Sequence, residues 1–261
     1  MKNLFFAILI IFFSCKNDKS SSSQKKEGLE LTILNNSINV PKINFEDLPA
    51  KRDYIYSTEE KNFGRNVIEF YIKNNSKKKY ALALNQNLLE YNDYDSGGKY
   101  DSCYYCKRNK IFYEFDNKQH FTYYSSHFQN LELEKKHIIY NKKISEELKD
   151  LKIPVIDEDI EFSKTVKDDL IVLQPGETKY FKKIIYLPFI NGVNKYSTQL
   201  SCIKFNPNKQ YKFNLRFFAD SSLMKKVMKK SIANKLMKNN VSIFDGTLVS
   251  NKVIVKFINL K

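Results

Sequence analysis

Short segments in which apolar and polar residues alternate recur along the chain, and they restrict the possible folds more than any other feature. In residues 67–73, Ile68, Phe70 and Ile72 fall on one face of an extended strand. Residues 212–218 alternate in the same way. A period of two residues is typical of a strand with one buried and one exposed face. The chain is therefore expected to fold mainly into β-sheet.

Turn-forming residues separate these segments and predict how they connect. Residues 74–76, Asn-Asn-Ser, follow the first strand, and the alternation resumes at residues 80–84, so the two strands are expected to form a hairpin. Pro175 and Gly176 predict a type II turn between two further strands. Proline fixes φ at the first central position of such a turn, and glycine permits a positive φ at the second.

The predicted strands are numerous enough for a β-sandwich. Besides those above, strands are expected at residues 29–34, 170–173, 178–187 and 247–257. About seven short strands with turns between them indicate this architecture.

Residues 85–167 do not fit a minimal sandwich. A loop of this length without structure is uncommon, so we expect an insertion with elements of its own. Local patterns predict strands within it at residues 110–115, 121–124 and 137–140.

Residues 221–240 are predicted to form one amphipathic helix between two adjacent strands. Apolar residues recur there at helical spacing, and lysines occupy much of the remaining surface. The apolar stripe can pack on the sandwich, or it can lie on anionic lipid. The connection to strands at both ends and the absence of Trp and Phe from the stripe favour packing. The stripe contains Leu223, Met224, Val227, Met228, Ile232, Leu236 and Met237.

Composition supports a folded protein and narrows its partners. Of 261 residues, 42% are hydrophobic and 28% are charged, which excludes a collagen, a coiled-coil rod, a polytopic membrane protein and a disulfide-dense miniprotein. The formal net charge is +15, but only four of the 44 basic residues are arginine, and the lysines are spread along the chain. Because nucleic-acid surfaces favour clustered arginine, we assign the charge to a solvated surface and expect no nucleic-acid partner.

The first fifteen residues have the pattern of an export signal. Lys2 is followed by an apolar run at residues 4–13, which is too short to span a bilayer core but suits the hydrophobic region of a signal peptide. Ser14 and Cys15 end this run. The alternatives are an ordinary secretory signal and an uncleaved anchor, but Phe12 beside Ser14 does not provide the small-x-small cleavage site of an ordinary signal.

This pattern resembles the signal of bacterial lipoproteins, in which a small residue precedes a cysteine that is lipidated and becomes the new N-terminus. The resemblance implies that residues 1–14 are a signal peptide and that Cys15 carries acyl chains, which attach the protein to a membrane. In such lipoproteins an Asp after the cysteine retains the protein at the inner membrane. Lys16 stands at that position, which implies the outer membrane and leaves open the periplasmic or the surface face.

The lipidated Cys15 and a flexible linker are expected to occupy residues 15–28. Residues 16–28 contain no apolar residue and include four consecutive serines, and a linker of this kind reaches roughly 20 Å. The folded domain is therefore expected at residues 29–261, with the insertion at about residues 85–167.

Three pieces of the chain carry a second resemblance. Residues 67–76, residues 173–178 and residues 244–251 are similar to parts of immunoglobulin-like domains in uncharacterised bacterial lipoproteins. The resemblance implies an immunoglobulin-like β-sandwich. Those families have no assigned catalytic residues, so the resemblance implies no site.

Cys103 and Cys106 form a Cys-x-x-Cys motif. A zinc site needs four ligands, and His120, His127 and Cys202 are not at a recognisable zinc spacing. A thioredoxin-like dithiol needs a βαβ context that this sequence lacks. Outside the cytoplasm a structural disulfide is the favoured interpretation, with free thiols as the alternative. Whether Cys202 pairs with Cys103 or Cys106 is open.

Asp93, Asp95 and Asp101 occupy the first, third and ninth positions of a calcium-binding loop. The fifth position is not acidic, and Tyr104 stands at the twelfth position in place of Glu. We favour a polar turn, with calcium as the alternative, and predict no metal and no cofactor.

The sequence contains no HExxH, G-x-S-x-G, Walker or G-x-G-x-x-G motif. We therefore expect a non-enzymatic binding or structural module at the cell envelope, with a protein or glycan partner. The alternatives are a glycan-binding nutrient-uptake lipoprotein, a protective or inhibitory lipoprotein that blocks a partner protein, and a carboxylate-dependent hydrolase. With no tryptophan in the chain, its 17 tyrosines would have to supply a sugar-binding platform.

Overall fold

The computed structural model describes residues 28–42, 64–84, 89–91, 110–117, 122–127, 131–155, 160–188 and 199–259. The strands are β1 (Leu29–Ile33), β2 (Ser37–Pro41), β3 (Arg65–Asn74), β4 (Lys79–Ala83), β5 (Glu90–Tyr91), β6 (Lys110–Phe115), β7 (Thr122–His127), β8 (Leu170–Leu173), β9 (Thr178–Tyr186), β10 (Gln199–Lys204), β11 (Lys212–Ala219), β12 (Val241–Ile243), β13 (Gly246–Val249) and β14 (Val253–Ile258). The helices are α1 (Leu131–Asp150), α2 (Ile160–Asp168), α3 (Ser221–Val227) and α4 (Lys230–Lys238).

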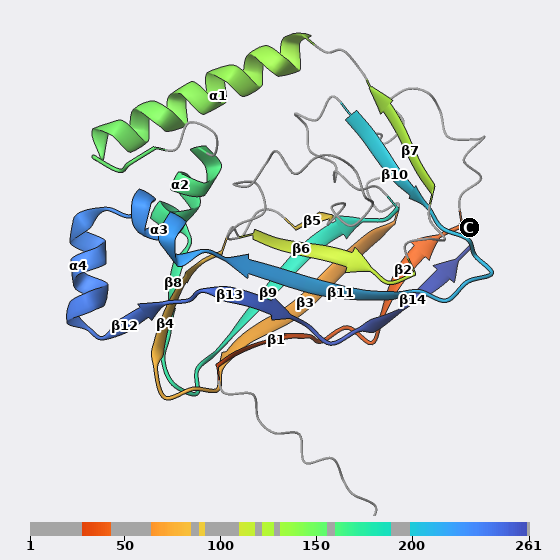
Figure 1. The fold of residues 1–261 in the computed structure, drawn as a ribbon. Helices are drawn as coiled ribbons and strands as arrows, with labels where there is room; N and C mark the ends of the chain where they lie inside the picture. The colour runs from red at the N-terminus through yellow and green to blue at the C-terminus, as the bar shows by residue number, and fades with distance from the viewer. Residues whose placement is uncertain are drawn as a thin grey trace, which may run out of the picture.

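Two sheets pack against each other and form the body of the molecule (Figure 1). Sheet A has the order β1-β3-β9, and sheet B has the order β2-β14-β11-β6-β5, with β13 also paired to β11. Sheet A is antiparallel, whereas sheet B includes the parallel pairs β14–β2 and β5–β6. The predicted mainly β, sandwich-like fold is therefore confirmed. The finer immunoglobulin-like assignment stays a prediction.

The alternating segments bury their apolar faces as predicted. On β11, Phe213 stacks on Tyr113 with ring centroids 5.7 Å apart and meets Phe115 edge to face at 5.5 Å. On β3, Phe70 stacks on Phe181 of β9 at 5.2 Å. The fully buried residues of the two predicted inner faces are Ile68, Phe70, Ile72, Phe213, Leu215 and Phe217.

Strands β3 and β4 do not pair with each other, so the predicted hairpin is wrong. β3 pairs with β1 and β9, whereas β4 pairs with β12 and β8. The ribbon β3–β9 instead continues around a corner as the ribbon β4–β8 (Figure 1). Buried Asn74 holds this corner, because its Nδ2 donates hydrogen bonds to the carbonyl oxygens of Lys78 at 2.7 Å and Leu173 at 3.1 Å.

The predicted turn at Pro175 and Gly176 is confirmed, and it forms the other half of the corner. The backbone N–H of Glu177 donates to the carbonyl oxygen of Gln174 at 3.0 Å, and Gly176 has a φ of +77°, as the second central position of a type II turn requires. The N–H of Gly176 also donates to the carbonyl oxygen of Asn74 at 2.8 Å. The two bends are therefore tied together.

Sheet C, with the order β12-β4-β8, separates two apolar cores. Leu82 and Leu84 belong to the sandwich core, whereas Ala81 and Ala83 face helices α2, α3 and α4. The helices supply most of the volume of this second core. Their buried residues are Phe162, Val166, Leu223, Met224, Val227, Met228 and Leu236.

Residues 221–240 form two helices, so the prediction of one helix is wrong. Met228 and Lys229 lie between α3 and α4 with extended ψ angles of 133° and 132°. A straight helix of this length would run roughly 30 Å and carry its second half away from sheet C. The break keeps both helices on the sheet. The predicted packing of the apolar stripe is confirmed, except that Met237 is 67% exposed.

Residues 85–167 have elements of their own, as expected, but part of this stretch belongs to the sandwich itself. β5 and β6 are strands of sheet B, and Ile111, Tyr113 and Phe115 lie in the sandwich core. β6 and β7 confirm the strands predicted at residues 110–115 and 121–124. Helices α1 and α2 were not predicted, and they contact each other through the ion pair between Lys167 and Glu147.

The strand predicted at residues 137–140 is wrong, because this segment belongs to α1. Ile138 and Ile139 are 65% and 67% exposed. The buried residues of α1 are Ile144 and Leu148, which lie one turn apart and pack with Ile153. The packing of Ile144 and Leu148 therefore outweighs the local β-propensity of Ile138 and Ile139, and the whole segment is helical.

The strand predicted at residues 247–257 is also wrong in detail, because it is divided into β13 and β14. Ser250 Oγ accepts a hydrogen bond from the N–H of Leu215 at 2.8 Å, and Asn251 Oδ1 accepts one from the N–H of Ile33 at 2.7 Å. These polar side chains replace strand pairing at the division. They also connect β1 of sheet A with sheet B.

Candidate binding surface

Most predicted site residues lie outside the described part of the chain. These residues are Cys15, Cys103, Cys106, Asp93, Asp95 and Asp101. Lipidation, the disulfide at the Cys-x-x-Cys motif and the calcium alternative therefore stay predictions.

Cys202, on β10, is the predicted site residue that the structure describes. Its side chain is fully buried and its thiol is free. Burial raises the pKa of this thiol to about 12, so it is protonated at neutral pH and a poor nucleophile. Cys202 is therefore a buried structural residue of the two-stranded sheet that β10 forms with β7.

The outer face of sheet A carries exposed aromatic and aliphatic side chains. In the ladder between β3 and β9, Val67 is opposite Ile184 and Tyr71 is opposite Tyr180. The two tyrosine rings meet edge to face at 5.8 Å. Tyr180 is 70% exposed and Ile184 is 46% exposed. We call Val67, Tyr71, Tyr180 and Ile184 the tyrosine face.

Charged and amide groups accompany the tyrosine face. Lys182 Nζ lies 2.6 Å from Glu69 Oε1. Glu30 of β1 accepts a hydrogen bond from Asn75 Nδ2 at 2.7 Å and a longer one from the Tyr71 hydroxyl at 3.4 Å. The bond from Asn75 contributes most to holding the pKa of Glu30 below its ordinary value, so this carboxylate is charged at neutral pH.

This surface combines aromatic contact area with hydrogen-bonding groups. Side chains that project from one face of a sheet form a broad surface, and a tyrosine offers both an apolar ring and a polar hydroxyl. The neighbouring carboxylates, ammonium and amide can bind hydroxyl or peptide groups. The arrangement suits an extended ligand with apolar and polar faces.

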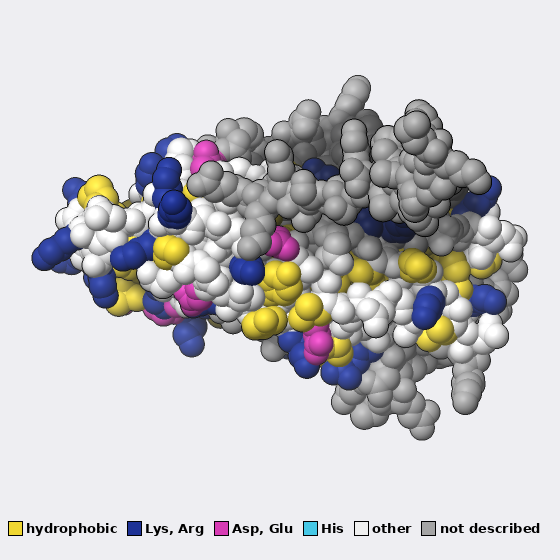
Figure 2. Space-filling model, turned by 90° about the horizontal axis from the view of Figure 1, so that it is seen from below, with side chains coloured by type: hydrophobic (Ala, Val, Ile, Leu, Met, Phe, Trp, Pro, Cys, Tyr) yellow, Lys and Arg dark blue, Asp and Glu magenta, His cyan; other side chains and the backbone are white. Residues whose placement is uncertain are grey.

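A basic surface lies at the end of the molecule formed by α3 and α4. Residues 221–244 contain six lysines and no acidic residue, and all six lysines are exposed. Figure 2 shows Lys and Arg side chains gathered at this end, on the left of the view. The six residues are Lys225, Lys226, Lys229, Lys230, Lys235 and Lys238.

A groove of about 430 Å³ lies beside these lysines, between α4 and sheet C. Lys79 and Lys235 stand along it, and Lys79 Nζ donates to the carbonyl oxygen of Asn239 at 3.4 Å. The apolar lining of the groove consists of Leu170, Val172, Ile232, Leu236 and Val241. With lysines beside this lining, the groove can hold an apolar group attached to an anion.

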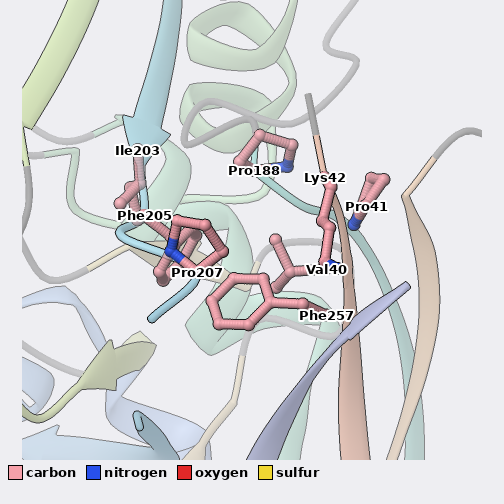
Figure 3. Close-up of a pocket in the computed structure, with 8 residues that line it drawn as sticks. All are labelled: Val40, Pro41, Lys42, Pro188, Ile203, Phe205, Pro207 and Phe257. Carbon is pink, nitrogen blue, oxygen red and sulfur yellow. The ribbon is translucent and has the colours of Figure 1, made fainter. Parts of the chain in front are cut away.

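A smaller pocket lies beside β2, β10 and β14, where Phe205, Pro207 and Phe257 converge with Val40 and Pro188 (Figure 3). Its volume is about 60 Å³. Ligand pockets usually measure roughly 300–1,000 Å³, and a water molecule occupies about 30 Å³. The pocket is therefore a packing gap at the edge of the core.

Glu114 of β6 is a buried carboxylate on sheet B. Its Oε1 accepts hydrogen bonds from Asn214 Nδ2 at 2.7 Å and from Arg216 Nη2 at 3.0 Å. The arginine compensates the buried charge, as in a structural ion pair. These contacts give Glu114 a role in holding β6 against β11.

Helix α1 exposes a second apolar group. Ile138 and Ile139 face solvent, and Tyr140 beside them is partly exposed. The helix is held to the domain through its other face and its C-terminal half, where Ile144 and Leu148 are buried. An exposed apolar group on a helix is a surface on which a protein partner can pack.

No family model, curated protein or solved structure matches this chain. Among the described residues, none of the helices is both long and apolar enough to cross a membrane. In the same residues, His, Cys, Asp and Glu side chains do not gather in groups of three or more that could hold a metal ion. The function is therefore inferred from the surfaces of this chain alone.

Proposed function

We propose that this protein is a lipid-anchored protein of the cell envelope that acts by binding a partner and not by catalysis. The apolar run that ends in Ser14 and Cys15 supports the anchor, and Lys16 supports the outer membrane. Strand β1 begins at Leu29, directly after the polar residues 16–28, which supports a folded domain held on a short tether.

The tyrosine face is the observation that carries the proposal of a binding function. Tyrosines supply a large contact area and lose little conformational entropy on binding, which is why binding surfaces favour them. Tyr180 is both exposed and flanked by the paired charges of Lys182 and Glu69. Rings beside hydrogen-bonding groups favour a glycan, whose sugar rings have apolar faces and hydroxyl edges.

The variant Tyr180→Ala tests this assignment. Binding of the mature protein to a panel of soluble glucans, xylans and mannans and to polysaccharide extracted from the envelope would be measured by calorimetry. Loss of a central aromatic contact is expected to weaken binding about tenfold or more. Met237→Ala is the matched control, because Met237 is similarly exposed but lies on α4. Equal binding by Tyr180→Ala and the unmodified protein, or no glycan bound by the latter, would reject the glycan assignment.

A second candidate function is that of a protective or inhibitory lipoprotein that blocks a partner protein. Exposed Ile138 and Ile139 on α1 favour it, because an apolar helix face can dock in a groove of another protein. A photo-crosslinker placed at residue 139 in intact cells should then capture one discrete protein. The same crosslinker at Ile254, an exposed position on β14, should not capture it.

A further inference from the structure

We propose that the end of the molecule formed by the β3–β4 corner and α4 faces the anionic headgroups of the membrane that holds Cys15. The inference rests on the proposed lipid anchor and adds an orientation to it. We call Lys77, Lys78, Lys79, Lys235 and Lys238 the anchor-end lysines.

The first step is the position at which the folded chain begins. The carbonyl oxygen of Gly28 accepts a hydrogen bond from the N–H of Asn75 at 2.8 Å, so the start of the domain lies at the corner between β3 and β4. Residues 16–28 would connect this point to a lipidated Cys15 over roughly 20 Å. The corner is therefore the part of the described structure that an anchor would hold nearest to the membrane.

The second step is the charge at this end. Lys77 and Lys78 follow Asn75 in the corner and are exposed. Lys79 is opposite Val241 in the sheet ladder, which brings the C-terminal end of α4 to the same place. There Lys235 and Lys238 are also exposed. Lysines from two parts of the chain thus gather beside the point where the tether begins.

Two described acidic residues, Glu30 and Glu177, lie near this end. Glu30 accepts hydrogen bonds from Asn75 and Thr32. Glu177 accepts one from the backbone N–H of Gln174 and lies 3.9 Å from Lys179 Nζ. Because the five anchor-end lysines outnumber these two carboxylates, this end has a net positive charge that complements anionic headgroups.

The contact is electrostatic and peripheral. Apart from the exposed Met237, the apolar residues of α3 and α4 pack on sheet C, so these helices offer no broad apolar face for insertion into lipid. Each lysine near an anionic leaflet contributes about fivefold to affinity, and the effect is confined to about a Debye length of 8 Å in physiological salt. A tether of roughly 20 Å would keep the anchor-end lysines within reach of the anionic headgroups.

Lysine acetylation read by mass spectrometry tests the orientation on the mature lipidated protein. The protein is reconstituted in vesicles of phosphatidylcholine with or without phosphatidylglycerol and isolated by flotation. We expect Lys77, Lys78, Lys235 and Lys238 to react several-fold more slowly on the anionic vesicles, and the protection to vanish in about 1 M salt. Lys209 should react equally on both vesicles, because it precedes β11 whereas α3 follows β11 at its other end.

The variant Lys77→Gln/Lys78→Gln adds a second readout. It should reduce the protection of Lys235 and Lys238, whereas the charge-matched control Lys209→Gln/Lys256→Gln should not. A protein that floats with the vesicles but reacts uniformly overturns the orientation and leaves the anchor intact. A protein that carries no acyl group and does not float overturns the anchor, and the orientation with it.

Discussion

The sandwich core and the helix-covered side of sheet C bury apolar surface by different means. Between sheets A and B, large rings from both sides fill the space, as in the stacked pairs Phe70–Phe181 and Phe213–Tyr113. On sheet C, Ala81 contributes almost no side-chain volume, and the helices supply it. Facing sheets lie about 10 Å apart and need large side chains from each, whereas a helix brings its own bulk.

This difference explains why two consecutive strands have different patterns of burial. β3 alternates because one of its faces is the solvent-exposed tyrosine face. β4 has buried residues at consecutive positions, because Leu82 belongs to one core and Ala81 and Ala83 to the other. A strand with an uninterrupted buried run therefore indicates a second layer above it.

The largest expected effect is in the sandwich core. Phe213 is fully buried on a strand with neighbours on both sides, and its ring contacts Tyr113 and Phe115. Phe213→Ala should lower the free energy of unfolding by about 3–5 kcal/mol, measured by denaturant titration. A loss below about 1 kcal/mol would show that the rings do not carry the stability of the sandwich.

The second core should respond less strongly. Leu236 is buried against sheet C but lies beside the open groove, so Leu236→Ala should cost about 2 kcal/mol. Met237→Ala, one residue further on, should cost less than about 0.5 kcal/mol because Met237 is exposed. Equal effects of the two variants in thermal melts would mean that α4 is not packed as described.

The smallest expected effect is a pH dependence at the edge of the sandwich. Lys183 of β9 is opposite the buried Ile68. Burial lowers the pKa of Lys183, and the negative charge of Asp169 raises it by a smaller amount. In the unfolded chain this lysine has its ordinary pKa of 10.5. Between the lowered folded pKa and 10.5 the unfolded state binds more protons, so this lysine's contribution to stability rises with pH.

The variant Lys183→Met should lose this rise of stability with pH. At neutral pH it should be more stable than the unmodified protein. Because Lys183 is only half-buried, solvent screening should keep the difference below about 1 kcal/mol. Denaturant titrations of both proteins at pH 7 and pH 10 measure it. A difference in free energy of unfolding between the two proteins that increases from pH 7 to pH 10 would contradict the assigned burial of the ammonium group.

The alternating pattern predicted the strands that have one face in solvent, and it failed where long-range contacts decide the structure. In sequence, the corner at Asn74 resembles a hairpin turn. The Asn74 side chain holds a corner instead because it donates a hydrogen bond to the carbonyl oxygen of Leu173, 99 positions away. The break at Met228 has no Gly or Pro to mark it, and it follows from the position of sheet C. β12 was missed because it has three residues directly after a helix.

The tyrosine face was only partly predictable. Tyr71 falls on the solvent side of the alternating segment 67–73, but nothing local indicates its neighbour. The register of β9 on β3 brings Tyr180 opposite Tyr71 across more than a hundred residues. The available signal was one tyrosine on the outward side of residues 67–73 and Tyr180 within residues 178–187, but the ladder that unites them is a property of the fold.

The mass of the mature N-terminus, measured on protein isolated from cells, tests the lipid anchor most directly. We expect residues 1–14 to be absent and the chain to begin at Cys15 with added acyl groups. Cys15→Ala should abolish incorporation of a labelled fatty acid. An unmodified Cys15, a chain that retains residues 1–14, or fatty-acid labelling that survives Cys15→Ala would contradict the account.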